Sequence, residues 1–182
     1  MNLKTVRGGI LAAVIAGTLL LTACEEGNVP ADSSGVQDFA SVDMNTADIP
    51  AAALAEHLLT KVAFDDPNMI QMDAEIAQTL YNVAGLAESV VSYGSTGATA
   101  EAILVLRCSN AENAAAAAEK IGKYRTEMAE IYASYNQPES VKLTKALLAQ
   151  DGVYVVFCVA PDAAAAESAY HAFVVDTVYS AN

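Results

Sequence analysis

Residues 89–179 contain the same order of elements twice. Each copy has two strand-like segments joined by a short turn and followed by an alanine-rich helical segment. In the first copy these segments are residues 89–93, 94–97, 101–108 and 111–135. In the second copy they are residues 141–150, 151–152, 153–159 and 161–179. The second turn, Asp151-Gly152, favours a hairpin because glycine accepts the positive φ that a type I′ turn requires. The sequence therefore predicts two ββα units.

The alternation of side chains along the strands indicates which face of the sheet the helices cover. Even-numbered residues from Ala102 to Cys108 share one face, and Arg107 lies on the other, so the even face is expected to carry the helices. By the same register, Tyr154, Val156 and Cys158 also face the helices. We expect an α+β fold in which two ββα units form a four-stranded, mainly antiparallel sheet with the helices packed on one face.

The opposite face of this sheet would be too apolar to remain in water. Its members in the second copy are Val153, Val155, Phe157 and Val159. An N-terminal helix, a partner protein or an apolar ligand would have to cover it. We expect two N-terminal helices to do so, and each has one apolar stripe. The stripe residues are Leu54, Leu58 and Val62 in the first helix, over residues 51–62, and Ile76, Leu80 and Val83 in the second, which Asp73 caps.

The N-terminus has the form of a secretory signal peptide. Lys4 and Arg7 precede an uncharged stretch from Gly8 through Cys24, whose 17 residues are few for a membrane-spanning helix. The stretch ends in Leu-Thr-Ala-Cys, which resembles the bacterial lipobox, where the cysteine carries diacylglycerol with acyl chains such as palmitate. Cys24 is thus a predicted lipidation site. The alternative is an uncleaved anchor in which Cys24 is incidental, and both place the following domain on the extracytoplasmic side of the cell membrane.

An acidic tether is predicted to follow the lipidation site. Residues 25–50 contain six acids, no base, two prolines and no sustained hydrophobic period, which is the composition of a disordered segment. The alternative, a cation-binding acidic strip, has no fixed geometry to support it. The predicted organisation is a lipoprotein signal peptide at residues 1–23, a tether at 24–49 and a single α+β domain at 50–182.

The charge balance limits the partners. Nine Lys and Arg residues stand against 22 Asp and Glu residues, for a net charge of −13, so the chain would repel nucleic acid. Its membrane affinity would come from the lipid anchor and not from a basic surface. The remaining expected partner is an unknown protein or small-molecule ligand.

Few residues suggest catalysis, and we assign no catalytic, cofactor-binding or metal-binding residue. His57 and His171 are far apart in sequence and have no neighbour at ligand spacing, so we interpret both as surface histidines. The Gly94–Gly97 turn lacks the Gly-Lys-Ser/Thr ending of a phosphate loop. An oxygen-rich cluster between residues 65 and 73 lacks the central glycine and closing glutamate of a calcium loop, so we interpret it as a solvated turn. Its members are Asp65, Asp66, Asn68, Met69, Met72 and Asp73.

Cys108 and Cys158 end the second strand of each copy, so the repeat predicts matching positions on one sheet face. We favour buried free thiols. A disulfide is the alternative in an exported protein, and it requires Cα atoms within about 7 Å. A catalytic or metal-binding thiol is less favoured, because only Arg107 is close enough in sequence to lower a thiol pKa.

Residues 100–170 resemble a family of small Gram-positive bacterial lipoproteins that carry the domain of unknown function 4358. The residues that carry the resemblance are the run from Ala100 to Leu106, the break from Tyr135 to Pro138, Ala146 to Gln150, Gly152 to Val156, and Pro161-Asp162. The resemblance implies a membrane-anchored extracytoplasmic domain with no assigned activity, and it supplies no site residues.

These observations together favour a lipid-anchored extracytoplasmic binding or accessory module. One alternative is a cell-envelope-directed hydrolase that uses acids near turns, such as Glu101 or Asp151. Another is a purely structural surface protein, which the absence of a pocket would indicate.

Overall fold

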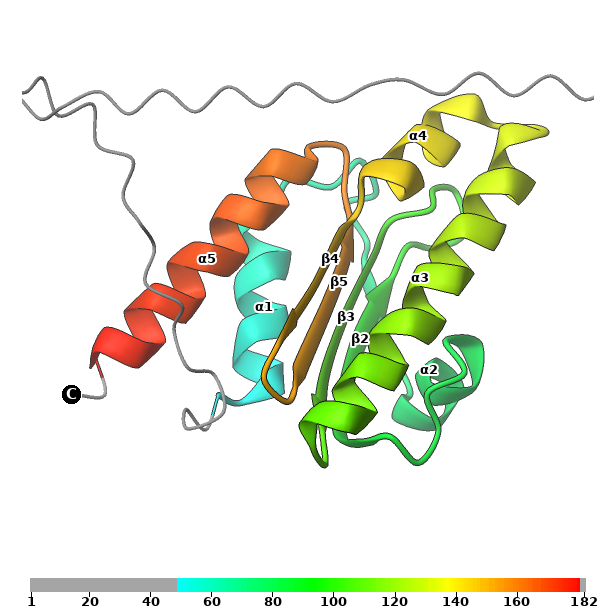
Figure 1. Ribbon diagram of the computed structural model, residues 1–182. Helices are drawn as coiled ribbons and strands as arrows, with labels where there is room; N and C mark the ends of the chain where they lie inside the picture. Colours follow the sequence, from blue (N-terminus) through cyan, green and yellow to red (C-terminus); the bar gives the residue numbers. More distant parts are fainter. Residues whose placement is uncertain (1–48, 181–182) are drawn as a thin grey trace, which may run out of the picture. The chain divides into compact units, whose positions relative to one another are not determined.

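The computed structural model describes residues 49–180, and their side chains as far as residue 177. This part of the chain forms a five-stranded sheet with five helices (Figure 1). The strands are β1 (Ile70–Met72), β2 (Ala87–Gly94), β3 (Ala102–Cys108), β4 (Leu147–Asp151) and β5 (Tyr154–Val159). The helices are α1 (Ala51–Lys61), α2 (Ala74–Leu80), α3 (Ala111–Ala133), α4 (Gln137–Lys145) and α5 (Ala163–Ser180). The strand order is β1-β2-β3-β5-β4, and every neighbouring pair is antiparallel.

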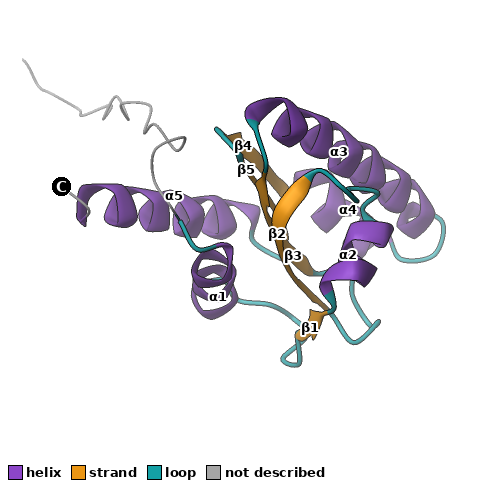
Figure 2. Ribbon diagram, turned by 90° about the horizontal axis from the view of Figure 1, so that it is seen from below, coloured by secondary structure: helices purple, strands orange, loops and turns teal. Residues whose placement is uncertain are grey.

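Helices cover both faces of the sheet. Figure 2 shows α1 and α5 on one side, and α2, α3 and α4 on the other. The first side buries Ile103, Val105 and Val156 against α1 and α5. The second buries Leu104, Leu106 and other strand residues against α2, α3 and α4. The sheet is therefore the middle layer of three, with one apolar core on each side.

The mixed α+β class is as expected, but the predicted four strands and the placement of both repeat helices on one face are wrong. A fifth strand, the short β1, pairs with β2 at the edge of the sheet. α1 covers the face opposite α3, as expected of an N-terminal helix, and α5 lies beside α1. α2 instead contributes to the core on the α3 side.

The pairing of β3 with β5 explains why the two long helices separate. Directly opposed residues point to the same face of an antiparallel sheet. Ile103 pairs with Cys158 and Leu104 with Phe157, so Cys158 shares a face with Ile103, whereas Cys108 shares a face with Leu104. Each cysteine does face its own following helix, but those helices lie on opposite faces. The expectation that the cysteines share one face is therefore wrong.

The segment predicted as one strand over residues 141–150 contains a helix and a strand. α4 ends at Lys145, and β4 begins at Leu147. Pro138 lies in the first turn of α4 with Glu139, and Lys142 and Lys145 lie in its last turn. Proline and acidic residues favour helix N-termini, and bases favour C-termini. These signals outweighed the apolar alternation that suggested a strand.

The capping residue of α2 is as predicted, but its expected apolar stripe is wrong. Asp73 Oδ1 accepts hydrogen bonds from the backbone nitrogens of Glu75 and Ile76. Ile76 and Leu80 nevertheless stay 60% and 42% exposed, while the helix buries Ala77. The helix ends at Leu80, and Val83 is buried beyond it.

The predicted hairpin at Asp151-Gly152 is confirmed. Gly152 has a φ of 57°, and Asp151 pairs with Tyr154 across the turn. The predicted signal peptide, Cys24 and the tether up to Asp48 lie outside the described residues. Among the helices that the structure describes, none combines the length and apolar character needed to cross a bilayer.

Candidate functional site: a groove between α3 and α4 and the polar cluster behind it

A buried glutamate anchors a polar cluster at one end of the sheet. Glu101 immediately precedes β3, and its side chain is 0% exposed. Its Oε1 accepts from the backbone nitrogen of Asp65 at 2.9 Å. Its Oε2 accepts from the backbone nitrogen of Asp66 at 2.9 Å and from Thr99 Oγ1 at 3.1 Å. These donors compensate the carboxylate for the hydration that it loses on burial.

Lys142 of α4 brings a positive charge into the same cluster. Its side chain is 11% exposed, and Nζ lies 2.7 Å from Asp65 Oδ2, 2.9 Å from Glu139 Oε1 and 3.1 Å from Glu101 Oε1. Burial alone would lower the pKa of Lys142, but hydrogen bonds to these three carboxylates outweigh it and raise the pKa. The ammonium therefore stays charged at neutral pH and is not available as a general base.

The loop that precedes β1 joins the cluster through Asp66. Its Oδ2 accepts from the backbone nitrogen of Thr96 at 2.8 Å and from Thr96 Oγ1 at 2.7 Å, and its Oδ1 accepts from the backbone nitrogen of Asn68. The hydrogen bonds from Thr96, followed by that from Asn68, lower the pKa of Asp66. Asp66 is buried, so the expected solvated turn is wrong at this residue.

The polar cluster ties three distant segments together: the loop before β1, the loop between β2 and β3, and α4. Glu139 completes it, because its Oε2 accepts from the backbone nitrogen of Ala100 at 2.8 Å. Asp73, which the sequence grouped with Asp65 and Asp66, instead caps α2. In residues 49–177, no group of three or more His, Cys, Asp or Glu side chains is placed to hold a metal ion. The polar cluster therefore holds α4 against the sheet.

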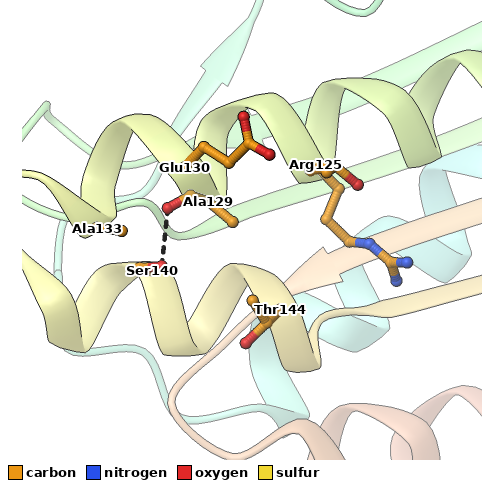
Figure 3. A pocket seen from close by; sticks show the side chains of 7 residues that line it. Arg125, Ala129, Glu130, Ala133, Ser140 and Thr144 are labelled. Atoms are coloured by element: carbon orange, nitrogen blue, oxygen red, sulfur yellow. Dashed lines mark hydrogen bonds between the residues drawn. The ribbon is translucent and has the colours of Figure 1, made fainter.

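A groove of about 300 Å³ lies between α3 and the side of α4 that does not enter the polar cluster (Figure 3). The side chains that line it are Arg125, Thr126, Ala129, Glu130, Ala133, Ser140 and Thr144. Arg125 extends from α3 towards the C-terminal end of α4, where Nη1 donates to the carbonyl oxygen of Ala146 at 3.4 Å. This bond is long, so most of the donor capacity of the guanidinium remains for a ligand.

The hydroxyl groups of the groove donate their protons to backbone carbonyls. Ser140 Oγ donates to Ala129 at 2.7 Å and so bridges the two helices (Figure 3). Thr126 Oγ1 donates to Gly122 at 3.1 Å, and Thr144 Oγ1 donates to Val141 at 2.9 Å. Each oxygen keeps lone pairs that can accept a hydrogen bond. The groove thus combines one cationic donor with neutral hydroxyl acceptors and the carboxylate of Glu130.

α4 presents a different set of residues to each neighbour. Glu139 and Lys142 enter the polar cluster, whereas Ser140 and Thr144 line the groove. Because the polar cluster fixes α4, it also fixes one wall of the groove. Such support from residues behind a site keeps its geometry constant and lowers the entropic cost of binding.

Glu101 and Asp151, the acids considered for hydrolysis, lie at opposite ends of the sheet. Ala102, next to Glu101, pairs with Val159 at the end of β5, whereas Asp151 pairs with Tyr154 at its beginning. Asp151 accepts a hydrogen bond from the hydroxyl of Tyr170. The two carboxylates therefore do not form a catalytic pair.

The two histidines also lie apart. His57 packs against Phe173, with ring centroids 5.1 Å apart, and its Nε2 has no hydrogen-bond partner within the described part of the chain. It is half-buried between α1 and α5, which differs from the expected surface position. His171 is exposed, with Nε2 3.8 Å from Glu167.

Cys108 and Cys158 are buried free thiols on opposite faces of the sheet, so the structure has no bridge between them. Burial raises the pKa of Cys108 to about 11. Burial, with a smaller effect from the charge of Glu101, raises the pKa of Cys158 to about 12. Both thiols are protonated at neutral pH and are poor nucleophiles.

The sequence interpretation missed the residues that matter most here: Arg125, Glu139 and Lys142. The strand predicted over residues 141–150 overlaps α4, so the sequence interpretation did not place Glu139 and Lys142 on one helix. Pro138 followed by Glu139 was the available signal for a helix start, and helical spacing then places Lys142 beside Glu139.

Comparison with protein families gave one match. The model of a domain of unknown function, DUF4358, matches residues 63–160. The matched region covers more than half of the chain and includes both the polar cluster and the groove. Comparisons with curated proteins and with solved structures gave no match.

Proposed function

The chain belongs to the DUF4358 family, and from this premise we propose that it is a lipid-anchored extracytoplasmic module that binds a small ligand in the α3–α4 groove. The observation that carries the binding role is Arg125. Its guanidinium lies in a groove between two helices and has a single long protein acceptor in the described residues. A partly buried cation with spare donors is a typical element of a binding site for a small polar ligand.

The proposed location rests on the N-terminal sequence. An uncharged stretch after Lys4 and Arg7 ends at Cys24, within a lipobox-like Leu-Thr-Ala-Cys. Diacylation of Cys24 provides two chains, and two chains suffice for stable anchoring where one holds only marginally. The acidic tether would then keep the domain away from the lipid headgroups.

Binding explains the arrangement of charges better than hydrolysis does. Lys142 is engaged by three carboxylates, and Glu101 is engaged by four donors. General acid–base catalysis needs a group that can reach a substrate and exchange a proton with it. The charged groups of the polar cluster instead stabilise the wall of the groove.

Fractionation of cells tests the anchoring part of the proposal. The native protein is expected in the membrane fraction, with a mass at Cys24 that includes diacylglycerol, and the Cys24→Ala variant is expected to be released. Equal partitioning of both proteins into the membrane would contradict it.

Blocking the groove tests the binding part. Thermal unfolding of the membrane-extracted lipoprotein would be followed with amino acids, short peptides, sugars and phosphate. A ligand is expected to raise Tm for the native chain but not for Ala133→Trp, which fills the groove from an exposed position. Ala84→Trp, at another exposed alanine outside the groove, is the matched control. An undiminished Tm shift in Ala133→Trp would contradict the assignment of the site.

A further inference from the structure

We infer that the ligand of the α3–α4 groove is a short peptide bound through its free C-terminal carboxylate. This inference rests on the proposed binding function and specifies its ligand. It follows from the different hydrogen-bonding capacities of the residues that line the groove. Arg125 offers donors from a cation, whereas the hydroxyl and carboxylate oxygens of the lining offer acceptors only.

Arg125 selects for a planar anion. A guanidinium has five N–H donors in a fixed fork that matches the two oxygens of a carboxylate. The protein occupies one donor of Arg125, with the carbonyl of Ala146 at 3.4 Å. A carboxylate in the groove can therefore take two parallel hydrogen bonds from Arg125 without displacing a strong internal bond.

The remainder of the groove selects for N–H groups. Ser140, Thr126 and Thr144 have all donated their hydroxyl protons to backbone carbonyls, so their free oxygens act as acceptors. Glu130, the other charged lining residue, is also an acceptor. A peptide matches this pattern because its carboxylate is followed by successive backbone N–H groups.

The same pattern disfavours a phosphate ligand. A phosphate dianion needs several donors around it, and the groove supplies one guanidinium among oxygen acceptors. The acidic character of the whole chain, with a net charge of −13, adds long-range repulsion of multiply charged anions. A single carboxylate is the anion that one arginine neutralises.

The size of the groove indicates a ligand of few residues. Its volume of about 300 Å³ is at the lower end of the roughly 300–1,000 Å³ range of small-molecule sites. Ala129 and Ala133 have short side chains, so the α3 wall of the groove is flat. A ligand with small side chains should therefore fit best. Trialanine is therefore a suitable probe.

The experiment compares trialanine with its C-terminal amide. Isothermal titration calorimetry would use the membrane-extracted lipoprotein in detergent. The acid is expected to bind at least tenfold more tightly than the amide, since hydrogen bonds between charged groups are about twice as strong as neutral ones. Inorganic phosphate at the same concentration is expected to compete weakly.

Two variants and a control assign the effect to Arg125. Arg125→Gln should abolish the preference for the acid. Thr144→Glu, at an exposed position of α4 in the groove wall, should do the same by giving Arg125 an internal carboxylate. Lys123→Gln removes a charge from the exposed part of α3 outside the groove lining and should leave the preference unchanged.

The inference would be overturned by equal affinity for acid and amide, by a preference that survives in both groove variants, or by phosphate competition as strong as that of trialanine. Absence of any trialanine binding would also overturn it. The proposed function would still stand if another ligand raised Tm and Ala133→Trp removed that shift, so the two failures are distinguishable.

Discussion

At the scale of single residues, Glu101 and Lys142 are opposite charges that the fold removes from water together. Such removal is unfavourable unless each charge finds enough partners. Glu101 has two backbone N–H donors, a hydroxyl and an ammonium, and Lys142 has three carboxylates. Because these partners come from three segments, each residue stabilises the loops as well as its own element.

We therefore expect Glu101→Ala to lower the free energy of unfolding by about 3–5 kcal/mol, because it leaves buried donors unsatisfied. Urea denaturation would measure this change. Glu88→Ala is the matched control, since Glu88 pairs with Arg107 at the surface with 55% of its side chain exposed. An exposed pair contributes about 0–1 kcal/mol. Similar losses in the two variants would contradict the structural role of the polar cluster.

At the scale of elements, α2 shows that the apolar stripe of a short helix can face water. Ala77 and the residues just after the helix, Tyr81 and Val83, are buried, whereas Ile76 and Leu80 are exposed. The segment turns after Leu80, where Asn82 adopts a positive φ of 56°. This turn carries Val83 into the core from a direction that helical periodicity does not describe.

This arrangement predicts different costs for two substitutions in one segment. Ile76→Ser should change the free energy of unfolding by less than about 0.5 kcal/mol, because its side chain is exposed. Val83→Ala should cost about 1.5–3 kcal/mol through lost burial and a residual cavity. Denaturant titration of both variants would measure the changes. A cost for Ile76→Ser as large as that for Val83→Ala would contradict the exposed position of Ile76 and favour the stripe predicted from the sequence.

At the scale of the whole molecule, folding shifts several titrations in one direction: burial raises the pKa of thiols and phenols, and hydrogen bonds to carboxylates raise the pKa of Lys142. The pKa is raised in Cys108, Cys158, Tyr81, Tyr124, Tyr170 and Lys142. A group whose pKa is raised on folding stabilises the native state below its unfolded pKa, and that stability is lost as the pH rises through the folded pKa. The domain should therefore lose stability in alkali.

We expect the urea midpoint to be level from pH 7 to about 9 and to fall between pH 9 and 11. The lower limit is set by the ordinary cysteine value of 9.0, and the folded values of Cys108 and Cys158 are about 11 and 12. Cys158→Ala should make the decline shallower by removing one of the protons involved. A urea midpoint that is constant up to pH 11 would contradict the expected effect of burial.

In acid, Asp66 acts in the opposite sense. Its pKa is lowered on folding, so its contribution to the stability of the native state is lost as the pH falls below 3.8.

The sequence by itself determined the local features of the domain. Asp73 caps α2, glycine turns the β4–β5 hairpin, and the alternation within β3 and β5 places each cysteine towards the helix that follows it. These features depend on residues that are close in the chain, so short-range sterics and hydrogen bonding suffice to predict them. The long α3 and α5 helices follow in the same way from their alanine-rich segments.

Only the tertiary structure decided which face each helix covers and which charges meet. A shift of one residue in the pairing of β3 with β5 would put Cys158 on the face of Cys108, and no local preference in either strand selects between the two registers. The meeting of Lys142 with Asp65 and Glu101 depends likewise on α4 reaching a loop more than 70 positions earlier in the chain. Packing of helices against both apolar faces of the sheet selects one register, and that energy is a property of the assembled layers.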